Sequence, residues 1–278
     1  MLILESIILG IIQGLTEFIP VSSSAHLLTI PKLFGWKDLG LAFDVALHLG
    51  TLVAVGLYFR KDWLAILGSF ARRVFKRVPY SSDPDPAKSG RLLVPIIIAC
   101  IPAAVVGKLF EDKIDALRDE PWALFGIAGV LVVISGVMFA AERLGTKLRS
   151  TGQMNYVDFI LIGFAQALAL FPGVSRSGIT ISTGLFRNLD REAAARFSFL
   201  LSTPIIFGAG VLKLKDAFEV GLPADQVALF GIGMVTAAVS GYLAIHFLMN
   251  YLKNRTLNAF VVYRLCFAAL LVVVALVR

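Results

Sequence analysis

The stretch GIIQGLTEFIPVSSSAHLL, residues 10–28, decides the fold of this chain. Apolar residues dominate it, but it also carries Glu17, the serine run 22–24 and His26, and Pro20 interrupts it. Proline removes a backbone donor and breaks a helix. So many polar groups do not suit an uninterrupted membrane helix, and the flanking residues are too apolar for a soluble loop. The stretch therefore predicts a broken segment that the rest of the chain holds inside a bilayer.

The composition of the chain is that of a membrane protein. Of its 278 residues, 58% are hydrophobic and 16% are charged, and the mean hydropathy is +0.82. Soluble domains average about half apolar and a quarter charged residues. The apolar residues form continuous blocks, whereas the strands of a membrane barrel would alternate apolar and polar residues. We therefore expect an all-α integral membrane protein that forms one polytopic domain over residues 1–278.

The apolar blocks predict the transmembrane helices, since a full helical span needs about 20 mostly apolar residues. Six blocks qualify, at residues 41–59, 92–110, 122–141, 196–214, 226–250 and 258–277. Two further apolar stretches, 4–30 and 156–186, are broken near their middles by Pro20 and by Pro172-Gly173. Such breaks are tolerated at membrane depth only where protein or a water-filled cavity covers them. We expect six transmembrane helices plus two re-entrant or broken helical hairpins.

The net charge of +7 comes from Lys and Arg residues that cluster between the apolar blocks. This pattern is typical of cytoplasmic loops, so we expect no nucleic-acid partner. The loop 60–91 is rich in Lys and Arg and is predicted to be cytoplasmic. Within it, KDWLAILGSFARRVF (61–75) is predicted to be an amphipathic helix on the membrane surface. The acid-rich loop 111–120 and the C-terminus then lie outside. The first broken stretch starts and ends outside, and the second starts and ends inside.

The sequence also repeats itself. A shift of 153 positions places Gly10, Gln13, Leu15, Phe18, Val21, Ser22 and Ser24 on Gly163, Gln166, Leu168, Phe171, Val174, Ser175 and Ser177. Each half, about 1–150 and 151–278, then contains one broken stretch and three crossings. Because three is odd, the halves must be inverted relative to each other, and their hairpins would meet near the midplane. Inverted repeats with midplane binding sites are a recurrent plan of membrane proteins.

The second broken stretch predicts an anion site. Ionisable side chains at membrane depth are costly, which makes them candidates for function, and this stretch carries an arginine within FPGVSRSGIT (171–180). Arginine presents a planar fork that matches phosphate oxygens. A glycine-rich turn that opens a helix points backbone amides at an anion. We therefore predict a phosphate-binding site formed by Ser175, Arg176, Ser177, Gly178 and Thr180.

The first broken stretch offers a metal site and a nucleophile. Gln13 and Glu17 are one helical turn apart, so their oxygens can face the same way. Such oxygen ligands suit Mg²⁺ or Ca²⁺, and Mg²⁺ in particular binds through one or two carboxylates plus substrate phosphate. Ser23 and His26 are three residues apart, which suits a nucleophile and its base. If the two hairpins meet, these groups and the predicted phosphate site share one pocket.

Each of these side chains also has a structural interpretation. Serines in membrane helices bond to the backbone or join helices. Glu17 could cap free amides at the break, His26 could simply pack, and Arg176 could neutralise a buried carboxylate. His48 and Asp44 lie on a regular span, where we expect a structural hydrogen-bond role. From the residues alone, hydrolysis and transport both stay open, because secondary transporters share broken helices and a midplane anion site.

At QGLTEF (13–18), PVSSSAH (20–26) and PGVSRSGIT (172–180) the chain resembles a known family. This is the undecaprenyl-diphosphate phosphatase family of bacterial inner-membrane proteins, of the bacitracin-resistance type. The likeness covers essentially the whole chain in length, motif order and span pattern. One family motif, P-G-x-S-R-S-x-x-T, matches at every fixed position. Another is Glu or Gln, three residues, then Glu, and the chain has the variant with glutamine, so the pair holds one carboxylate.

The resemblance implies roles for particular residues. The family's serine and histidine fall on Ser23 and His26. Together with Glu17 and Arg176 they are the implied catalytic residues, with either Ser23 or His26 as the nucleophile. A divalent cation is implied as well, for which Glu17 and Gln13 are the candidate ligands.

The resemblance further implies the substrate and the location. The reaction would be hydrolysis of undecaprenyl diphosphate, the spent lipid carrier of cell-wall synthesis, to undecaprenyl phosphate and phosphate. The protein would lie among the lipids of the bacterial cytoplasmic membrane as a homodimer, with its site open to the extracytoplasmic side, and would confer bacitracin resistance. The competing function is a secondary transporter or lipid flippase, which would release no phosphate.

Overall fold

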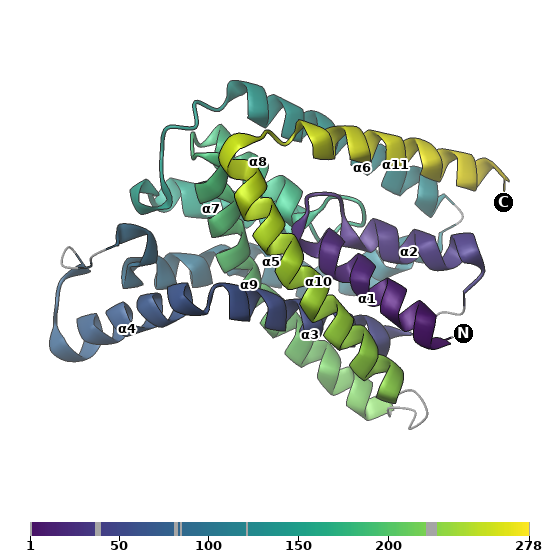
Figure 1. Ribbon diagram of the computed structural model, residues 1–278, viewed down its shortest axis with the longest axis horizontal. Helices are drawn as coiled ribbons and strands as arrows, with labels where there is room; N and C mark the ends of the chain where they lie inside the picture. The colour runs from purple at the N-terminus through teal and green to yellow at the C-terminus, as the bar shows by residue number, and fades with distance from the viewer. Residues whose placement is uncertain are drawn as a thin grey trace.

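The computed structural model describes residues 2–36, 40–80, 83, 85–120, 122–220 and 227–277 (Figure 1). These residues form no β-strand. Their α-helices are α1 (Leu2–Phe18), α2 (Ser23–Phe34), α3 (Leu41–Tyr58), α4 (Arg60–Lys76), α5 (Leu93–Asp119), α6 (Ala123–Leu144), α7 (Tyr156–Leu168), α8 (Arg176–Phe186), α9 (Arg191–Val220), α10 (Val227–Asn254) and α11 (Asn258–Val277). Short 3-10 turns lie at Pro86–Lys88, Gly90–Leu92 and Thr151–Gln153. The prediction of an all-α protein is confirmed.

Within the described residues, five helices are long and apolar enough to cross a membrane, namely α5, α6, α9, α10 and α11. The sixth predicted span, 41–59, is α3, which passes the same test only together with α4. The two helices are bent by 70° at Phe59. The predicted surface helix is therefore present as α4, and in Figure 1 it extends away from the body of the molecule.

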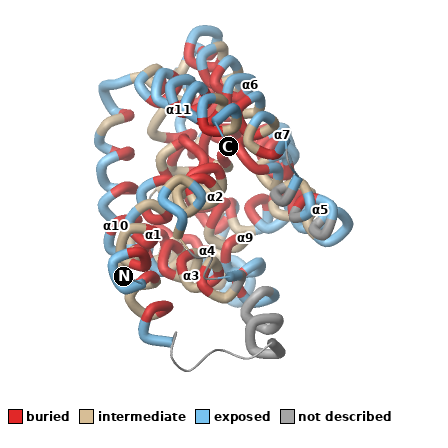
Figure 2. Tube along the Cα trace, turned by 90° about the vertical axis from the view of Figure 1, so that its right-hand side faces the viewer, coloured by how far each residue is buried: buried red, intermediate tan, exposed pale blue. Residues whose placement is uncertain are grey.

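Apolar side chains cover the outside of the spanning helices. Val133 on α6, Leu243 on α10 and Val273 on α11 are between 57% and 63% exposed. Figure 2 shows exposed residues along the outer faces of these helices and buried residues along their inner faces. Soluble monomers rarely expose large apolar patches. This distribution is that of an integral membrane protein.

Both predicted broken stretches are broken in the structure, and the helix after each break begins at the matching position. α1 ends at Phe18 and α2 begins at Ser23, while α7 ends at Leu168 and α8 begins at Arg176. The residue before each new helix is a serine with positive φ: Ser22 has φ 78° and ψ 96°, and Ser175 has φ 69° and ψ 111°. Positive φ is uncommon outside glycine. The repeat found in the sequence thus recurs as one unusual backbone conformation.

Helices of the first half pack against helices of the second half. α1 packs against α10, and α7 packs against α5, so that each broken stretch contacts a helix of the other half. α3 packs on α9, and α6 lies beside α11, as Figure 1 also shows. Exchanging the halves maps this set of contacts onto itself. The inverted orientation of the halves across a membrane stays a prediction.

Two glycines at equivalent positions of the repeat allow these close contacts between the halves. A Cβ on Gly10 of α1 would lie 2.6 Å from the Gly233 carbonyl oxygen of α10. A Cβ on Gly163 of α7 would lie 2.7 Å from the Ala99 carbonyl oxygen of α5. Small residues let membrane helices approach closely. The repeat therefore conserves the packing of the broken stretches as well as their breaks.

Ion pairs join the loops that are predicted to be cytoplasmic. Asp158, whose role the sequence left unassigned, lies 2.6 Å from Arg149 and 2.7 Å from Arg187. Glu142 pairs with Arg191, and Asp62 of α4 pairs with Arg196 of α9. These pairs hold the ends of α6, α7, α8 and α9 together, away from the two breaks.

Candidate active site

A cavity of about 280 Å³ lies where the two breaks meet. Its polar lining comes from both breaks and from α3, and comprises Thr16, Glu17, Ser22, Ser23, Ser24, Asp44, His48, Gln166, Ser175 and Arg176. One apolar wall is formed by α9, through Ile205, Ile206, Ala209 and Gly210. A charged, hydroxyl-rich end next to an apolar wall suits an amphipathic ligand.

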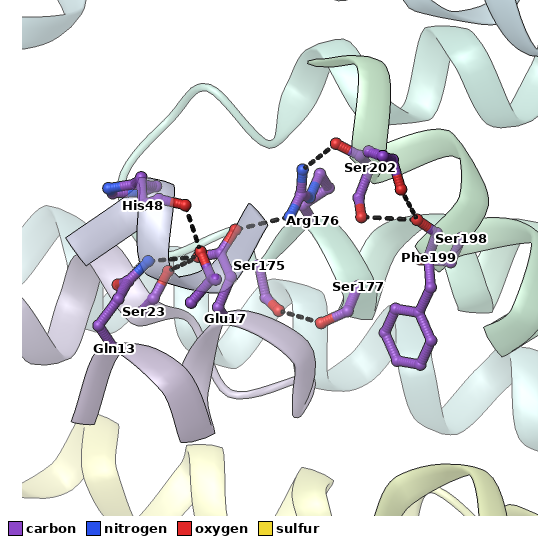
Figure 3. A network of polar contacts seen from close by, with 12 residues as sticks. Gln13, Glu17, Ser23, His48, Ser175, Arg176, Ser177, Ser198, Phe199 and Ser202 are labelled. Atoms are coloured by element: carbon purple, nitrogen blue, oxygen red, sulfur yellow. Dashed lines mark hydrogen bonds and ion pairs between the residues drawn. The ribbon is translucent and has the colours of Figure 1, made fainter. Parts of the chain in front are cut away.

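An ion pair joins the two breaks inside the cavity. The Arg176 guanidinium donates to Glu17 Oε1 over 2.6 Å (Figure 3). The other carboxylate oxygen, Oε2, accepts from Ser23 Oγ at 2.7 Å and from Gln13 Nε2 at 3.2 Å. Arg176 also donates to the Ser202 carbonyl oxygen at 3.4 Å. The structure thus brings together four of the residues that the sequence singled out, from positions more than 150 residues apart.

Two helix N-termini point at the same cavity. α2 begins at Ser23 and α8 begins at Arg176, and both residues line it. The first N–H groups of a helix carry a partial positive charge and bind anions. Arg176 and the two helix starts are the groups of the cavity that favour an anion, and the Glu17 carboxylate paired with Arg176 offsets part of that charge. This arrangement follows from the breaks, because each break starts a new helix at membrane depth.

The predicted phosphate-binding set is only partly in the cavity. Ser175 and Arg176 line it. Ser175 Oγ accepts from the Gly178 amide at 3.2 Å and lies 3.3 Å from Ser177 Oγ, so it caps α8. Thr180 bonds to the Arg176 carbonyl oxygen and to Ser198, both at 2.7 Å. Ser177, Gly178 and Thr180 therefore lie behind the cavity wall, where they fix the start of α8.

His26 lies in different surroundings from those expected of a base for Ser23. Its Nδ1 lies 2.7 Å from the Ser22 carbonyl oxygen and its Nε2 lies 2.8 Å from the Tyr263 hydroxyl. The ring stacks on Phe267 with centroids 4.1 Å apart. It is 3% exposed and is not among the described residues that line the cavity. Nδ1 is thus engaged by the backbone of the first break and Nε2 by Tyr263 of α11, although the sequence placed His26 beside the nucleophile.

His48 lines the cavity, although the sequence predicted only a structural hydrogen bond for it. That hydrogen bond is present, because Nδ1 lies 2.8 Å from the Asp44 carbonyl oxygen one turn earlier on α3. His48 also belongs to the cavity lining, and it lies near Glu17 and Ser23 in Figure 3. Only the rotation of α3 decides this, and no local sequence signal reports it.

Arg264 was missed by the sequence interpretation and connects the two breaks. It lies on α11, is 0% exposed, and donates to the carbonyl oxygens of Pro20 at 3.5 Å and Gly173 at 2.9 Å. Further contacts reach Ser135 and Leu131 on α6. The breaks also contact each other directly, through the Gly173 amide and Ser24 Oγ at 3.4 Å. A lone arginine inside the apolar block 258–277 was the available signal.

The residues offer partial support for a divalent cation. Gln13 Oε1 is a buried oxygen with no hydrogen-bond partner among the described residues, one turn from Glu17. Those residues contain no group of three or more His, Cys, Asp or Glu side chains that could hold a metal ion. Both oxygens of Glu17 already accept hydrogen bonds. The donor set therefore fits a cation held jointly with a diphosphate, and does not fit a resident metal held by protein alone.

The fold and the cavity define a class: a helical membrane protein with a polar cavity between two broken helices. Within that class, the chain belongs to the bacitracin resistance protein BacA family, whose model matches residues 6–270.

Curated relatives resemble the chain over its full length. A protein of Moorella thermoacetica is 46% identical over 100% of both chains. One of Desulforudis audaxviator is 45% identical over 99% of this chain and 98% of its own. One of Rubrobacter xylanophilus is 46% identical over 96% of each. All three are named undecaprenyl-diphosphatase.

Proposed function

We propose that this chain hydrolyses undecaprenyl diphosphate to undecaprenyl phosphate and inorganic phosphate. The observation that carries the proposal is the convergence of two helix N-termini, Arg176 and the Glu17–Ser23 pair on one membrane-embedded cavity. The names of the full-length relatives support the substrate. The apolar wall on α9 suits the start of a polyprenyl tail, and no observation favours the transporter or flippase interpretation.

Arg176 and the two helix starts bind the diphosphate in this proposal. A guanidinium has five N–H donors in a fixed fork, and contacts with Glu17 and Ser202 leave others for phosphate oxygens. Phosphoryl transfer depends mainly on positioning and on stabilising the charge of the transferred group. The positive groups around the cavity supply this stabilisation.

Ser23 is the proposed nucleophile. Its Oγ attacks the terminal phosphorus, the bridging phosphorus–oxygen bond breaks, and undecaprenyl phosphate leaves. Glu17 takes the Ser23 proton through their 2.7 Å contact and passes it to the departing phosphate oxygen. Water then attacks the phosphoserine, one of its protons returns to Ser23 Oγ through Glu17, and phosphate leaves. His26 is the alternative nucleophile, but both of its ring nitrogens have other partners.

A divalent cation, Mg²⁺ or Ca²⁺, is proposed to bind with the diphosphate. When bound, it would neutralise part of the phosphate charge. Glu17 Oε2 and Gln13 Oε1, one helical turn apart on α1, are the proposed protein ligands, with Glu17 in the cavity lining and Gln13 buried behind it. Glu17 also holds Ser23, so the same carboxylate would orient the nucleophile.

We further propose that the protein lies in the bacterial cytoplasmic membrane with its cavity open to the extracytoplasmic side. The ion-paired loops, rich in Lys and Arg, support a cytoplasmic position for the opposite side. A cysteine replacing Glu120 should react with an impermeant thiol reagent added to intact cells, and one replacing Arg73 should not. The reverse labelling pattern would overturn the orientation. The expected homodimer stays a prediction.

The deciding experiment is phosphate release from purified protein in detergent. An enzyme releases phosphate from undecaprenyl diphosphate without any gradient or second compartment, whereas a transporter does not. The matched control substrate carries a methylene group in place of the bridging oxygen, and it should bind without releasing phosphate. Lack of turnover of undecaprenyl diphosphate by folded protein would refute the proposed function.

A further inference from the structure

Gln166 lines the cavity without a hydrogen-bond partner. It lies in the last turn of α7 and is 2% exposed. Neither its Nε2 nor its Oε1 has a partner among the described residues, although both atoms are buried. Buried polar groups in native proteins are almost always bonded. A buried primary amide that has no partner among the described residues, on a side chain that lines a cavity, is therefore a candidate for binding a ligand.

The repeat explains why this amide lacks a protein partner. Its counterpart, Gln13, donates to Glu17 one turn later at 3.2 Å. In the second half, the position that corresponds to Glu17 is Leu170, which also lines the cavity and accepts no hydrogen bond. The second half has thus kept the glutamine and has an apolar residue in place of its acceptor. The other charged groups nearby, Glu17 and Arg176, are already paired with each other.

We propose that Gln166 is a substrate-binding residue whose Nε2–H donates to a phosphate oxygen of the diphosphate. The proposal rests on the proposed function, since it assigns the ligand of the same cavity. A neutral amide adds a donor without adding charge, so it complements Arg176 and the two helix starts. A phosphate oxygen replaces the carboxylate oxygen that Gln13 has in the first half.

The test compares substrate affinity with the stability of the free protein. Gln166→Leu should raise KM for undecaprenyl diphosphate by roughly 10- to 100-fold, on the scale of one hydrogen bond to a charged group, with a smaller change in kcat. Because the variant removes an unbonded amide, its melting temperature without substrate should stay equal or rise. Inorganic pyrophosphate should raise the melting temperature of the natural protein, and Gln166→Leu should lose this rise.

Two further variants make the test specific. Ser6→Ala removes another buried oxygen that has no partner among the described residues, on α1 and outside the cavity lining. It should stabilise the free protein similarly and leave KM unchanged. Gln166→Glu keeps the size of the side chain but replaces the donor with a negative charge, so it should raise KM more than Gln166→Leu. If Gln166→Leu does not fold, the KM of Gln166→Glu alone decides whether Gln166 binds the substrate.

The outcomes separate this proposal from the function itself. An unchanged KM in Gln166→Glu, or a lower melting temperature of Gln166→Leu with normal KM, would mean that the amide has a structural role and would overturn the proposal. If the natural protein released no phosphate but pyrophosphate still stabilised it and not Gln166→Leu, the binding role would stand while the proposed hydrolysis would fail.

Discussion

The first break, residues 19–22, and the second break, residues 169–175, differ in length and in chemistry but end in the same serine conformation. Each ends in a serine with positive φ whose Oγ lies near the hydroxyl of the serine two positions later, at 3.2 Å in the first and 3.3 Å in the second. The first half adds the acceptor Glu17 and the hydroxyl of Ser23. The second half places Leu170 and Arg176 at those two positions.

This difference shows how a duplicated element can form an asymmetric site. The backbone supplies the same feature twice, namely a helix that starts at the cavity. In the proposed mechanism the side chains differ in role, because the first half provides the nucleophile with its acceptor and the second half provides the arginine. Neither half holds the whole set, so the site exists only where the two breaks meet.

The largest expected loss of turnover comes from removing the Ser23 hydroxyl, which has no counterpart in the second half. Ser23→Ala should lower phosphate release by roughly 1,000-fold or more, on the scale of removing a nucleophile. His26→Gln should lower phosphate release by no more than roughly 100-fold, because His26 lies outside the cavity lining and can only orient the neighbouring first break. Rapid quench with a substrate labelled in its terminal phosphate should trap label on the natural protein and not on Ser23→Ala. Label retained by Ser23→Ala and lost in His26→Gln would make His26 the nucleophile.

The second largest expected loss of turnover comes from changing Arg176, a charged side chain that only the second half supplies. Arg176→Lys keeps the charge but loses the fork, so turnover should fall by roughly 100-fold or more. Arg176→Ala leaves Glu17 buried without its cation, which should cost about 3–5 kcal/mol of folding free energy. Adding Glu17→Gln to Arg176→Ala should restore monodisperse yield in detergent but not activity. Restored activity in the double variant would overturn the proposed roles of both Arg176 and Glu17.

Both breaks accept hydrogen bonds from Arg264, so a variant of Arg264 should affect them together. Arg264→Met leaves the Pro20 and Gly173 carbonyl oxygens without their donor, at about 1–3 kcal/mol for each buried group. The melting temperature in detergent and turnover should fall together, because the distance between Ser23 and Arg176 depends on both breaks. Arg255→Met, at an exposed position, is the matched control and should change neither. A normal melting temperature for Arg264→Met would show that the breaks do not depend on α11.

The smallest expected effect comes from making the first break more acidic. Gln13→Glu restores the two-carboxylate form of the motif, so activity should stay within about threefold while the dependence on added Mg²⁺ or Ca²⁺ steepens. Glu17→Gln is the contrasting variant of the same pair: it removes the carboxylate and should lower turnover about as much as Ser23→Ala does. A chelator should inhibit the natural protein. The assay is phosphate release over a titration of each cation. Full activity of Glu17→Gln with unchanged cation dependence would remove Glu17 from the proposed cation site.

The sequence by itself determined the membrane class, the positions of the spans, both breaks and the correspondence between Ser22 and Ser175. These features depend on local signals: continuous hydropathy, proline and glycine at the breaks, and a repeated pattern of polar residues. Tertiary structure alone decided that Arg176 meets Glu17, that His26 turns to Tyr263, that His48 enters the cavity and that Arg264 joins the breaks. The reason is physical. Lipid and protein interior are both apolar, so the hydropathy of a membrane helix does not specify its rotation, and contacts between distant helices depend on that rotation.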